Sequence, residues 1–128
     1  MRMQMIREDK QSKKVLVIED DQDLVSLVAM LLQEDGYRVD VACNGREALD
    51  RMEQEIPDLI LLDMKMPIMN GPEFARELEV RYGHQGPIVV LTAAADAHRS
   101  AAEVGADAWL GKPFEPDTLL STVRRYAG

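Results

Sequence analysis

The chain has 128 residues, of which 46% are hydrophobic, so it is long enough for one domain with a buried core and too short for a second. Its formal net charge of -8 argues against direct binding to nucleic acid phosphates, which needs a basic surface, and favours protein partners. No apolar stretch approaches the ~20 residues that cross a bilayer, and the single cysteine, Cys43, excludes an internal disulfide framework and is compatible with the reducing cytoplasm.

Residues 1–13 mix charged side chains with methionine and lack the apolar centre of a signal peptide, so we expect a flexible N-terminal tail there and a single domain over 14–128. The apolar run at 15–19 predicts a first strand. From Leu24 onward, apolar residues recur at helical spacing and predict a helix that ends at Gly36. The remaining elements follow in chain order: strand 38–42, helix 44–54, strand 58–62, a helix from Asn70 closed by Gly83, strand 87–91, helix 95–104, strand 107–110 and a last helix from 116.

The strand-like runs are apolar without alternation, which is typical of parallel strands that helices cover on both faces. Repeated units of strand, helix and strand require right-handed crossovers between parallel neighbours. The sequence therefore predicts an α/β fold, a doubly wound five-stranded parallel sheet with helices on both faces.

Polar side chains stand at or just beyond the ends of four of these strand-like runs. They are Glu19 and Asp20 after the first run, Asp63 after the third, Thr92 after the fourth and Lys112 shortly after the fifth. In open parallel sheets, ligands bind beyond the carboxyl ends of the strands. We therefore expect these acids, this hydroxyl and this ammonium group to meet in one crevice.

Three carboxylates in that crevice call for a cation, because two unit charges of one sign at 4 Å repel by roughly 4 kcal/mol at an effective dielectric of 20. The predicted ligands, Glu19, Asp20 and Asp63, are all hard oxygen donors, which favours Mg²⁺, with Mn²⁺ as the alternative, over zinc. A carboxylate beside such an ion can attack phosphorus. Asp63 is the candidate nucleophile, and Lys112 and Thr92 would bind phosphoryl oxygens.

The chain closely resembles the receiver domain of two-component response regulators over about residues 14–127. The resemblance rests on four segments: Val17-Ile18-Glu19-Asp20-Asp21, Leu61-Leu62-Asp63-Met64-Lys65-Met66-Pro67, Leu91-Thr92-Ala93 and Gly105-Ala106-Asp107-Ala108-Trp109-Leu110-Gly111-Lys112-Pro113-Phe114. It implies a flavodoxin-like strand order, 2-1-3-4-5. It also implies a protein that takes a phosphoryl group from a histidine kinase or a histidine phosphotransfer protein and then changes its partner-binding surface.

The resemblance also implies roles for individual residues. Asp63 would be the phosphoacceptor and, with Asp20, a direct metal ligand, while Glu19 would bind the metal through a water and Lys65 through its backbone carbonyl. The switch and phosphoryl-binding residues would be Thr92, Ala93, Lys112 and Trp109. The peptide between Lys112 and Pro113 would be cis. Trp109 stands where tyrosine or phenylalanine is more usual, and by its residue type alone it would be a partly buried core aromatic. Lys65 and Ala94 are expected to tune the lifetime of the phosphoryl group, since neither can accept a proton from an attacking water.

Three other functions fit less well. A phosphatase of the haloacid dehalogenase type needs a second aspartate two residues after the nucleophile, where this chain has Lys65. A flavodoxin-like electron carrier needs a loop rich in serine and threonine after the first strand, where Glu19 and the two acids that follow it would repel the flavin phosphate. An inert pseudo-receiver would lack a site residue, and none is missing.

The favoured interpretation is a regulatory phosphoacceptor of the cytoplasm that catalyses only its own phosphoryl transfer and dephosphorylation. The sequence leaves open the cognate kinase, the downstream protein target and a phosphorylation-dependent homodimer. It also leaves open whether the receiver stands alone or was cut from a larger regulator.

Overall fold

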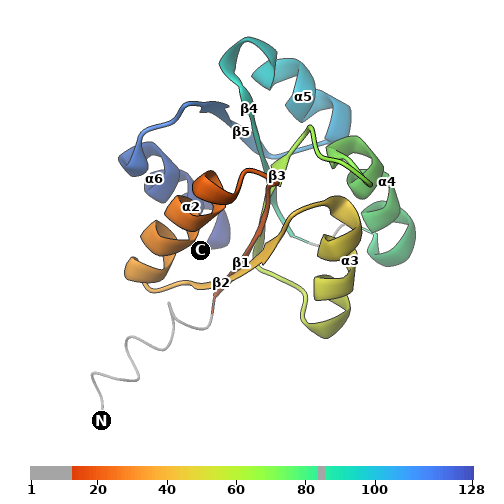
Figure 1. Cartoon of the computed structure of the whole chain (residues 1–128), viewed down its shortest axis with the longest axis horizontal. Coiled ribbons are helices and arrows are strands. Elements are labelled where there is room, and N and C mark those ends of the chain that lie inside the picture. The colour runs from red at the N-terminus through yellow and green to blue at the C-terminus, as the bar shows by residue number, and fades with distance from the viewer. Residues whose placement is uncertain (1–12, 84–85) are drawn as a thin grey trace.

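The computed structural model describes residues 13–83 and 86–128, and these form one parallel sheet with helices on both sides (Figure 1). The strand order is β2-β1-β3-β4-β5, which confirms the order that the resemblance implies. The strands are β1 (Lys14–Ile18), β2 (Arg38–Ala42), β3 (Leu59–Asp63), β4 (Ile88–Ala93) and β5 (Ala108–Lys112). The helices are α2 (Gln22–Glu34), α3 (Gly45–Gln54), α4 (Gly71–Tyr82), α5 (Ala97–Val104) and α6 (Pro116–Ala127), and a 3-10 turn, η1 (Ala94–Asp96), precedes α5. The tail expected at 1–13 lies outside the described residues except for Lys13, whose carbonyl accepts a hydrogen bond from Arg38 N.

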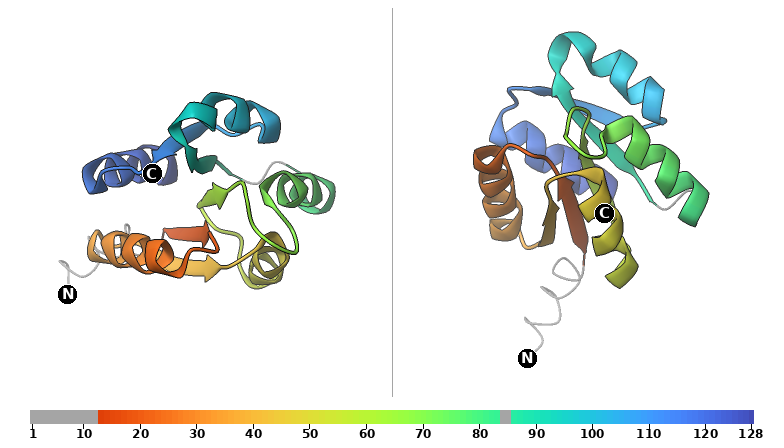
Figure 2. Two further views of the ribbon diagram at one scale, coloured as in Figure 1. Left: turned by 45° about the horizontal axis from the view of Figure 1, so that its top comes forward. Right: turned by 45° about the vertical axis from the view of Figure 1, so that its right-hand side comes forward.

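Two hydrophobic cores lie on opposite faces of the sheet. Helices α2 and α6 cover one face, and α3 and α4 cover the other, with α5 beside α4 (Figures 1 and 2). Successive residues of a strand point to opposite faces, so Val17 enters the first core and Leu16 and Ile18 enter the second. Both faces of β1 are therefore buried, which is why its apolar run is continuous.

Asparagine caps begin two of the helices. Asn70 accepts a hydrogen bond from Glu73 N while the Glu73 side chain accepts one from Asn70 N, a capping box that starts α4. Asn44 accepts from Glu47 N at the start of α3. Because both caps lie at the carboxyl edge of the sheet, they help to fix the loops that surround the polar strand ends.

Several strand boundaries differ from the predicted ones. Strand β3 includes Asp63, and the last two strands continue beyond their apolar runs because Thr92 pairs with Gly111 and Ala93 with Lys112 in the β4–β5 ladder. The predicted helix at 95–104 is divided into η1 and α5. Asp63, Thr92 and Lys112 are therefore held by strand backbone rather than by loops, which restricts their positions.

Gly71 is placed where the chain cannot carry a side chain. A Cβ atom at this position would lie 2.7 Å from the carbonyl oxygen of Asp63 and 2.9 Å from the Cα of Met64. Gly71 N also donates a hydrogen bond to the Met64 carbonyl over 3.1 Å. The missing side chain lets the start of α4 approach the end of β3 closely.

An ion-pair network lies on the edge of the sheet that β2 forms. Glu55 accepts two hydrogen bonds from Arg38 and one from Lys14, while Asp40 pairs with Lys14 and Arg51 over 3.3 Å each. The bonds from Arg38 and then from Lys14 lower the pKa of Glu55 from its usual 4.5 to about 2. An edge strand that carries this many charges is a poor template for pairing with another sheet.

The Glu55 network predicts a pH-dependent contribution to stability. A carboxyl group whose pKa is lowered in the folded state stabilises it fully above the unfolded pKa of 4.5, and this contribution is lost as the pH falls toward about 2. We expect Glu55→Gln to be less stable than wild type at about pH 6 and to approach it at about pH 3 in urea unfolding at low salt. Glu53→Gln is the control, since Glu53 lies 3.9 Å from its partner Arg81 and should track wild type at both pH values. A difference between Glu55→Gln and wild type that stays constant with pH would contradict the prediction.

No helix within the described residues is both long and apolar enough to cross a membrane.

Candidate functional site

A polar cavity of about 320 Å³ opens at the carboxyl edge of the sheet. It is lined by Glu19, Asp20, Asp21, Asp63, Lys65, Thr92, Ala93, Asp96 and Lys112. These residues come from the ends of four neighbouring strands and the segments that follow them, as the sequence predicted. Asp96 also lines the cavity, although its sequence context does not mark it as a site residue.

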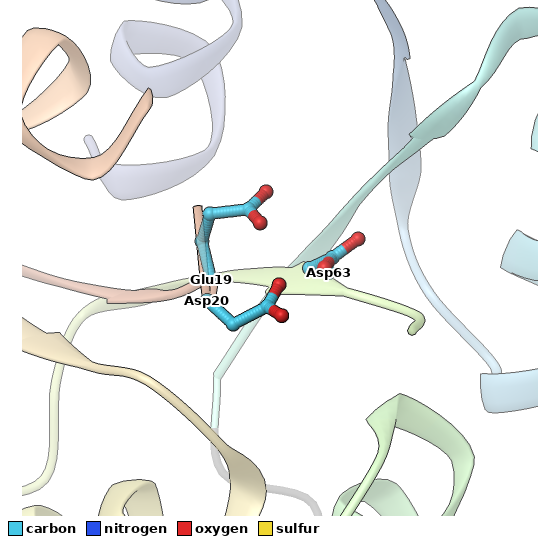
Figure 3. A group of neighbouring side chains, drawn as sticks. All are labelled: Glu19, Asp20 and Asp63. Atoms are coloured by element: carbon cyan, nitrogen blue, oxygen red, sulfur yellow. The ribbon is translucent and has the colours of Figure 1, made fainter. Parts of the chain in front are cut away.

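Three of the carboxylates form a cluster that fits a divalent cation. One oxygen each from Glu19, Asp20 and Asp63 lies within 4.8 Å of the others, and Figure 3 shows the Glu19 and Asp20 side chains extending toward the Asp63 side of the site. Glu19 is 1% exposed and Asp63 6%, whereas Asp20 is exposed. Hard oxygen donors beside an open cavity, with room for several waters, match the coordination that Mg²⁺ prefers.

Lys112 bridges two members of this cluster. Its Nζ donates a hydrogen bond to Glu19 Oε1 over 2.6 Å and another to Asp63 Oδ1 over 3.2 Å. Asp63 Oδ1 also accepts from Met64 N over 2.9 Å, and Glu19 Oε2 accepts from Asp21 N over 3.1 Å. The nucleophile candidate is therefore held between a fixed ammonium group and a fixed backbone amide.

The environment of this pair shifts the pKa of each partner. Burial raises the pKa of Glu19, and the hydrogen bonds from Lys112 and from the Asp21 amide offset the effect of burial only in part. For Lys112, burial alone lowers the pKa, but the hydrogen bond to Glu19 and the charges of Asp63 and Glu19 outweigh it, so the pKa is raised. Lys112 therefore stays protonated at neutral pH and supplies the positive charge that the acidic cluster lacks.

Thr92 lies at the end of β4 and is buried, with Ala93 and Ala94 following it in exposed positions. Its hydroxyl side chain lines the same cavity as Asp63 and Lys112. The small residues that follow leave the mouth of the cavity open. Thr92 and Asp63 therefore border the same cavity.

Trp109 does not lie in the core. Its side chain is 46% exposed and forms an edge-to-face pair with the exposed His98 of α5, with 5.3 Å between the ring centroids. The interpretation of Trp109 as a core aromatic, which its residue type alone favours, is therefore wrong. The role as a switch residue, which the resemblance implies for Trp109, stays a prediction.

The loop after β3 brings Lys65 to the cavity. Met69 N donates to the Pro67 carbonyl over 2.7 Å around Ile68, whose φ of 68° is unusual for a β-branched residue. The Lys65 side chain is exposed and lines the cavity mouth. On the other side of the site, the peptide between Lys112 and Pro113 is cis, as the resemblance implied.

Asp96 was missed because nothing in its own sequence context marks it. It comes four residues after Thr92, after three alanines, at the point where a helix was expected to begin. An acidic residue there is ordinarily a helix cap. The signal that could have found it is positional, because every loop that follows a parallel strand at this edge borders the same crevice.

The fold and the site together define a doubly wound α/β protein with an acidic, metal-compatible pocket at the carboxyl edge of its sheet. The family model for the response regulator receiver domain matches residues 15–124. The chain therefore belongs to the response regulator receiver domain family, whose members are phosphoacceptors of two-component systems.

Relatives and solved structures agree with this assignment. The chain is 41% identical over 113 residues to the transcriptional regulatory protein CpxR of Escherichia coli K12. This alignment covers 87% of the chain and 47% of CpxR. It matches the chemotaxis response regulator CheY4 of Vibrio cholerae with a TM-score of 0.79 and 38% identity, over 88% of this chain and 97% of that one. The chain also matches the receiver domain of the Pseudomonas aeruginosa sensor histidine kinase PA1611, which was solved with a magnesium ion in its active site cleft. The TM-score is 0.81 and the identity 28%, and the match covers 91% of this chain and 98% of that one. The chain spans about half the length of the curated relatives that it matches.

Proposed function

We propose that this receiver domain accepts a phosphoryl group on Asp63 in a reaction that requires Mg²⁺. The observation that carries the proposal is the position of Asp63 at the end of a buried strand, beside Asp20 and within 3.2 Å of Lys112 Nζ. In phosphoryl transfer, catalysis consists mainly of positioning and of neutralising charge on the transferring group. Asp63 supplies the nucleophilic oxygen, and the lysine supplies a positive charge on one side of it.

The acidic cluster would hold the metal ion opposite Lys112. Asp20 and Asp63 would bind it directly, Glu19 through a water, and the backbone carbonyl of Lys65 would complete the protein ligands. Mg²⁺ supplies charge neutralisation for the phosphoryl oxygens, and Mn²⁺ can replace it. The magnesium ion in the related PA1611 receiver supports this assignment.

The response would be read out through Thr92, Ala93, Lys112 and Trp109. A phosphoryl group on Asp63 would offer new hydrogen-bond acceptors to Lys112 and to the Thr92 hydroxyl. In the unphosphorylated chain Lys112 donates a hydrogen bond to Glu19. Trp109 lies on the strand that carries Lys112 and is exposed beside His98, so movement at the site can reach the surface. Lys65 and Ala94 would set how long the phosphoryl group persists.

Receiver domains of response regulators are partners of histidine kinases. For this chain the donor of the phosphoryl group would be a histidine kinase or a histidine phosphotransfer protein. The phosphorylated chain would then bind a downstream protein, and it could also form a homodimer that depends on phosphorylation. The protein would act in the cytoplasm. It would not be an enzyme that turns over an external substrate, because its chemistry is confined to gaining and losing its own phosphoryl group.

The test is the intact mass of the full chain after incubation with a small acyl phosphate donor. We expect one added phosphoryl group with Mg²⁺ present and none after chelation by EDTA, because the charge on the donor is then not neutralised. The phosphatase alternative would be supported instead if the chain steadily released phosphate from an aryl phosphate substrate. The rate of that release would have to be far above the rate at which the acyl phosphate on the protein decays. A wild-type chain that gains no phosphoryl group with saturating Mg²⁺ would contradict the proposed function.

A further inference from the structure

Among the described carboxylates of the cavity, Asp96 belongs neither to the metal cluster nor to the Lys112 bridge, and unlike Asp21 it does not cap a helix. Glu19, Asp20 and Asp21 follow β1, whereas Asp96 follows β4 in the turn η1. Strands β1 and β4 flank β3 on opposite sides, so Asp63 lies between the two groups of carboxylates. Asp96 therefore faces the cavity from the side that is away from the metal cluster.

The Asp96 side chain is not used as a helix cap. It precedes α5, where an aspartate ordinarily accepts a hydrogen bond from the first helical turn, but it makes no side-chain cap bond. Its Oδ1 instead accepts a hydrogen bond from Arg99 over 2.8 Å, and the Asp96 side chain is 41% exposed. The contact with Arg99 uses Oδ1, so Oδ2 of this partly exposed side chain can accept a hydrogen bond from solvent.

The turn that carries Asp96 is held closely against β5. A Cβ atom on Gly111 would lie 2.9 Å from the Cβ of Ala94, so Gly111 lets η1 approach the strand that ends in Lys112. Backbone packing therefore holds the turn that carries Asp96 close to the strand that ends in Lys112, and Arg99 adds an exposed ion pair to Asp96. A side chain on a fixed turn can orient a small molecule more accurately than one on a loose loop.

We propose that Asp96 positions the water that removes the phosphoryl group from Asp63; this inference rests on the proposed function. In that step the water oxygen bonds to phosphorus while the bond between phosphorus and the Asp63 carboxyl oxygen breaks. Asp63 returns to a carboxylate, inorganic phosphate leaves, and the proton lost by water passes through Asp96 to phosphate or solvent. Asp96 accepts the hydrogen bond from the water and Arg99 holds Asp96 in place.

Asp96 supplies what the two expected lifetime positions lack. The ammonium group of Lys65 donates hydrogen bonds and cannot accept one, and the methyl group of Ala94 does neither. Among the described residues that line the cavity on the β4 side, Asp96 is the anionic acceptor. The lifetime of the phosphoryl group therefore depends on a residue of η1 and not on Lys65 and Ala94 alone.

The test is the rate of phosphoryl loss from the phosphorylated full chain at saturating Mg²⁺. We expect Asp96→Ala to slow the loss by about tenfold, below the ~100-fold that a fully positioned general base contributes. Asp96→Asn keeps an acceptor oxygen and should restore part of the rate. Arg99→Ala should slow the loss less than Asp96→Ala, and the double variant should be no slower than Asp96→Ala, since Arg99 acts through Asp96.

Two further measurements separate positioning from other effects. The affinities for Mg²⁺ and for beryllofluoride should be unchanged in Asp96→Ala, and Asp50→Ala, which removes an exposed carboxylate of α3, should decay as wild type does. Wild-type decay in Asp96→Ala would overturn this inference while leaving Asp63 as the phosphoacceptor. Equal slowing in Asp96→Ala and Asp96→Asn that disappears at high salt would also overturn it, because the effect would then be one of net charge.

Discussion

Asp63→Asn is expected to gain no phosphoryl group under conditions that phosphorylate the wild-type chain. The carboxamide keeps the size of the side chain and can still accept the hydrogen bonds from Met64 N and Lys112 Nζ, so the strand end should stay intact. It lacks the anionic oxygen that attacks phosphorus. Intact-mass measurement after exposure to a small acyl phosphate donor with Mg²⁺ gives the result directly.

A second signature of Asp63→Asn concerns stability. The three clustered carboxylates lie within 4.8 Å of one another, and removing one negative charge reduces their repulsion. Without divalent ions, the free energy of unfolding should therefore rise, and the gain from adding Mg²⁺ should shrink because a ligand is lost.

Asp21→Asn is the matched control for both measurements. Asp21 lines the same cavity but accepts hydrogen bonds from Asp23 N and Leu24 N as the cap of α2, a role that asparagine performs equally well. This variant should be phosphorylated as wild type is. If Asp63→Asn gained a phosphoryl group at the wild-type rate, or if Asp21→Asn lost that ability, Asp63 would not be the phosphoacceptor.

The fold was predictable from the sequence because burial on both faces leaves a simple pattern. The strand that ends in Asp63 is apolar at every preceding position, since Leu59 and Leu61 enter one core and Ile60 and Leu62 the other. The ends of the later strands were less visible. Thr92 and Lys112 are polar, so hydropathy ends each strand early, while the hydrogen-bonded ladder continues through them.

The site was predictable in its residue types but not in its contacts. Parallel strands bring their carboxyl ends together, so Glu19, Asp63 and Lys112 were expected in one crevice. Lys112 lies closer to Glu19 than to Asp63, with hydrogen bonds of 2.6 Å and 3.2 Å. This difference depends on side-chain packing between residues that are 93 positions apart in the sequence, which no local pattern predicts. The ring contact between Trp109 and His98 likewise joins two different elements, and no local pattern marks it.

Lys112→Ala is expected to leave phosphorylation of Asp63 possible while removing its effect on the surface. Glu19 is 1% exposed and Lys112 29%, so the variant leaves a buried carboxylate without its charged partner. Breaking such a pair costs about 3 kcal/mol, the lower end for buried ion pairs because Lys112 is partly in water. The loss of stability should be largest at neutral pH without divalent ions.

The sign of the pH effect follows from the carboxylates that remain. The pKa of Glu19 is already raised by burial and is lowered in part by Lys112, so removing the lysine raises it further. A carboxyl group whose pKa is raised in the folded state destabilises that state as the pH climbs through the raised pKa. The difference in unfolding free energy between Lys112→Ala and wild type should therefore shrink as the pH falls toward the usual range of a carboxyl group.

Mg²⁺ should compensate for the missing lysine, because both neutralise the same carboxylates. We expect Lys112→Ala to bind Mg²⁺ at least as tightly as wild type and to gain more stability from it. With beryllofluoride added, Trp109 emission should change in wild type and stay unchanged in the variant, since Lys112 would no longer connect the site to β5. Lys65→Ala, which removes an exposed lysine from the same cavity, should respond as wild type does. A full Trp109 response in Lys112→Ala would show that the signal reaches the surface without this lysine.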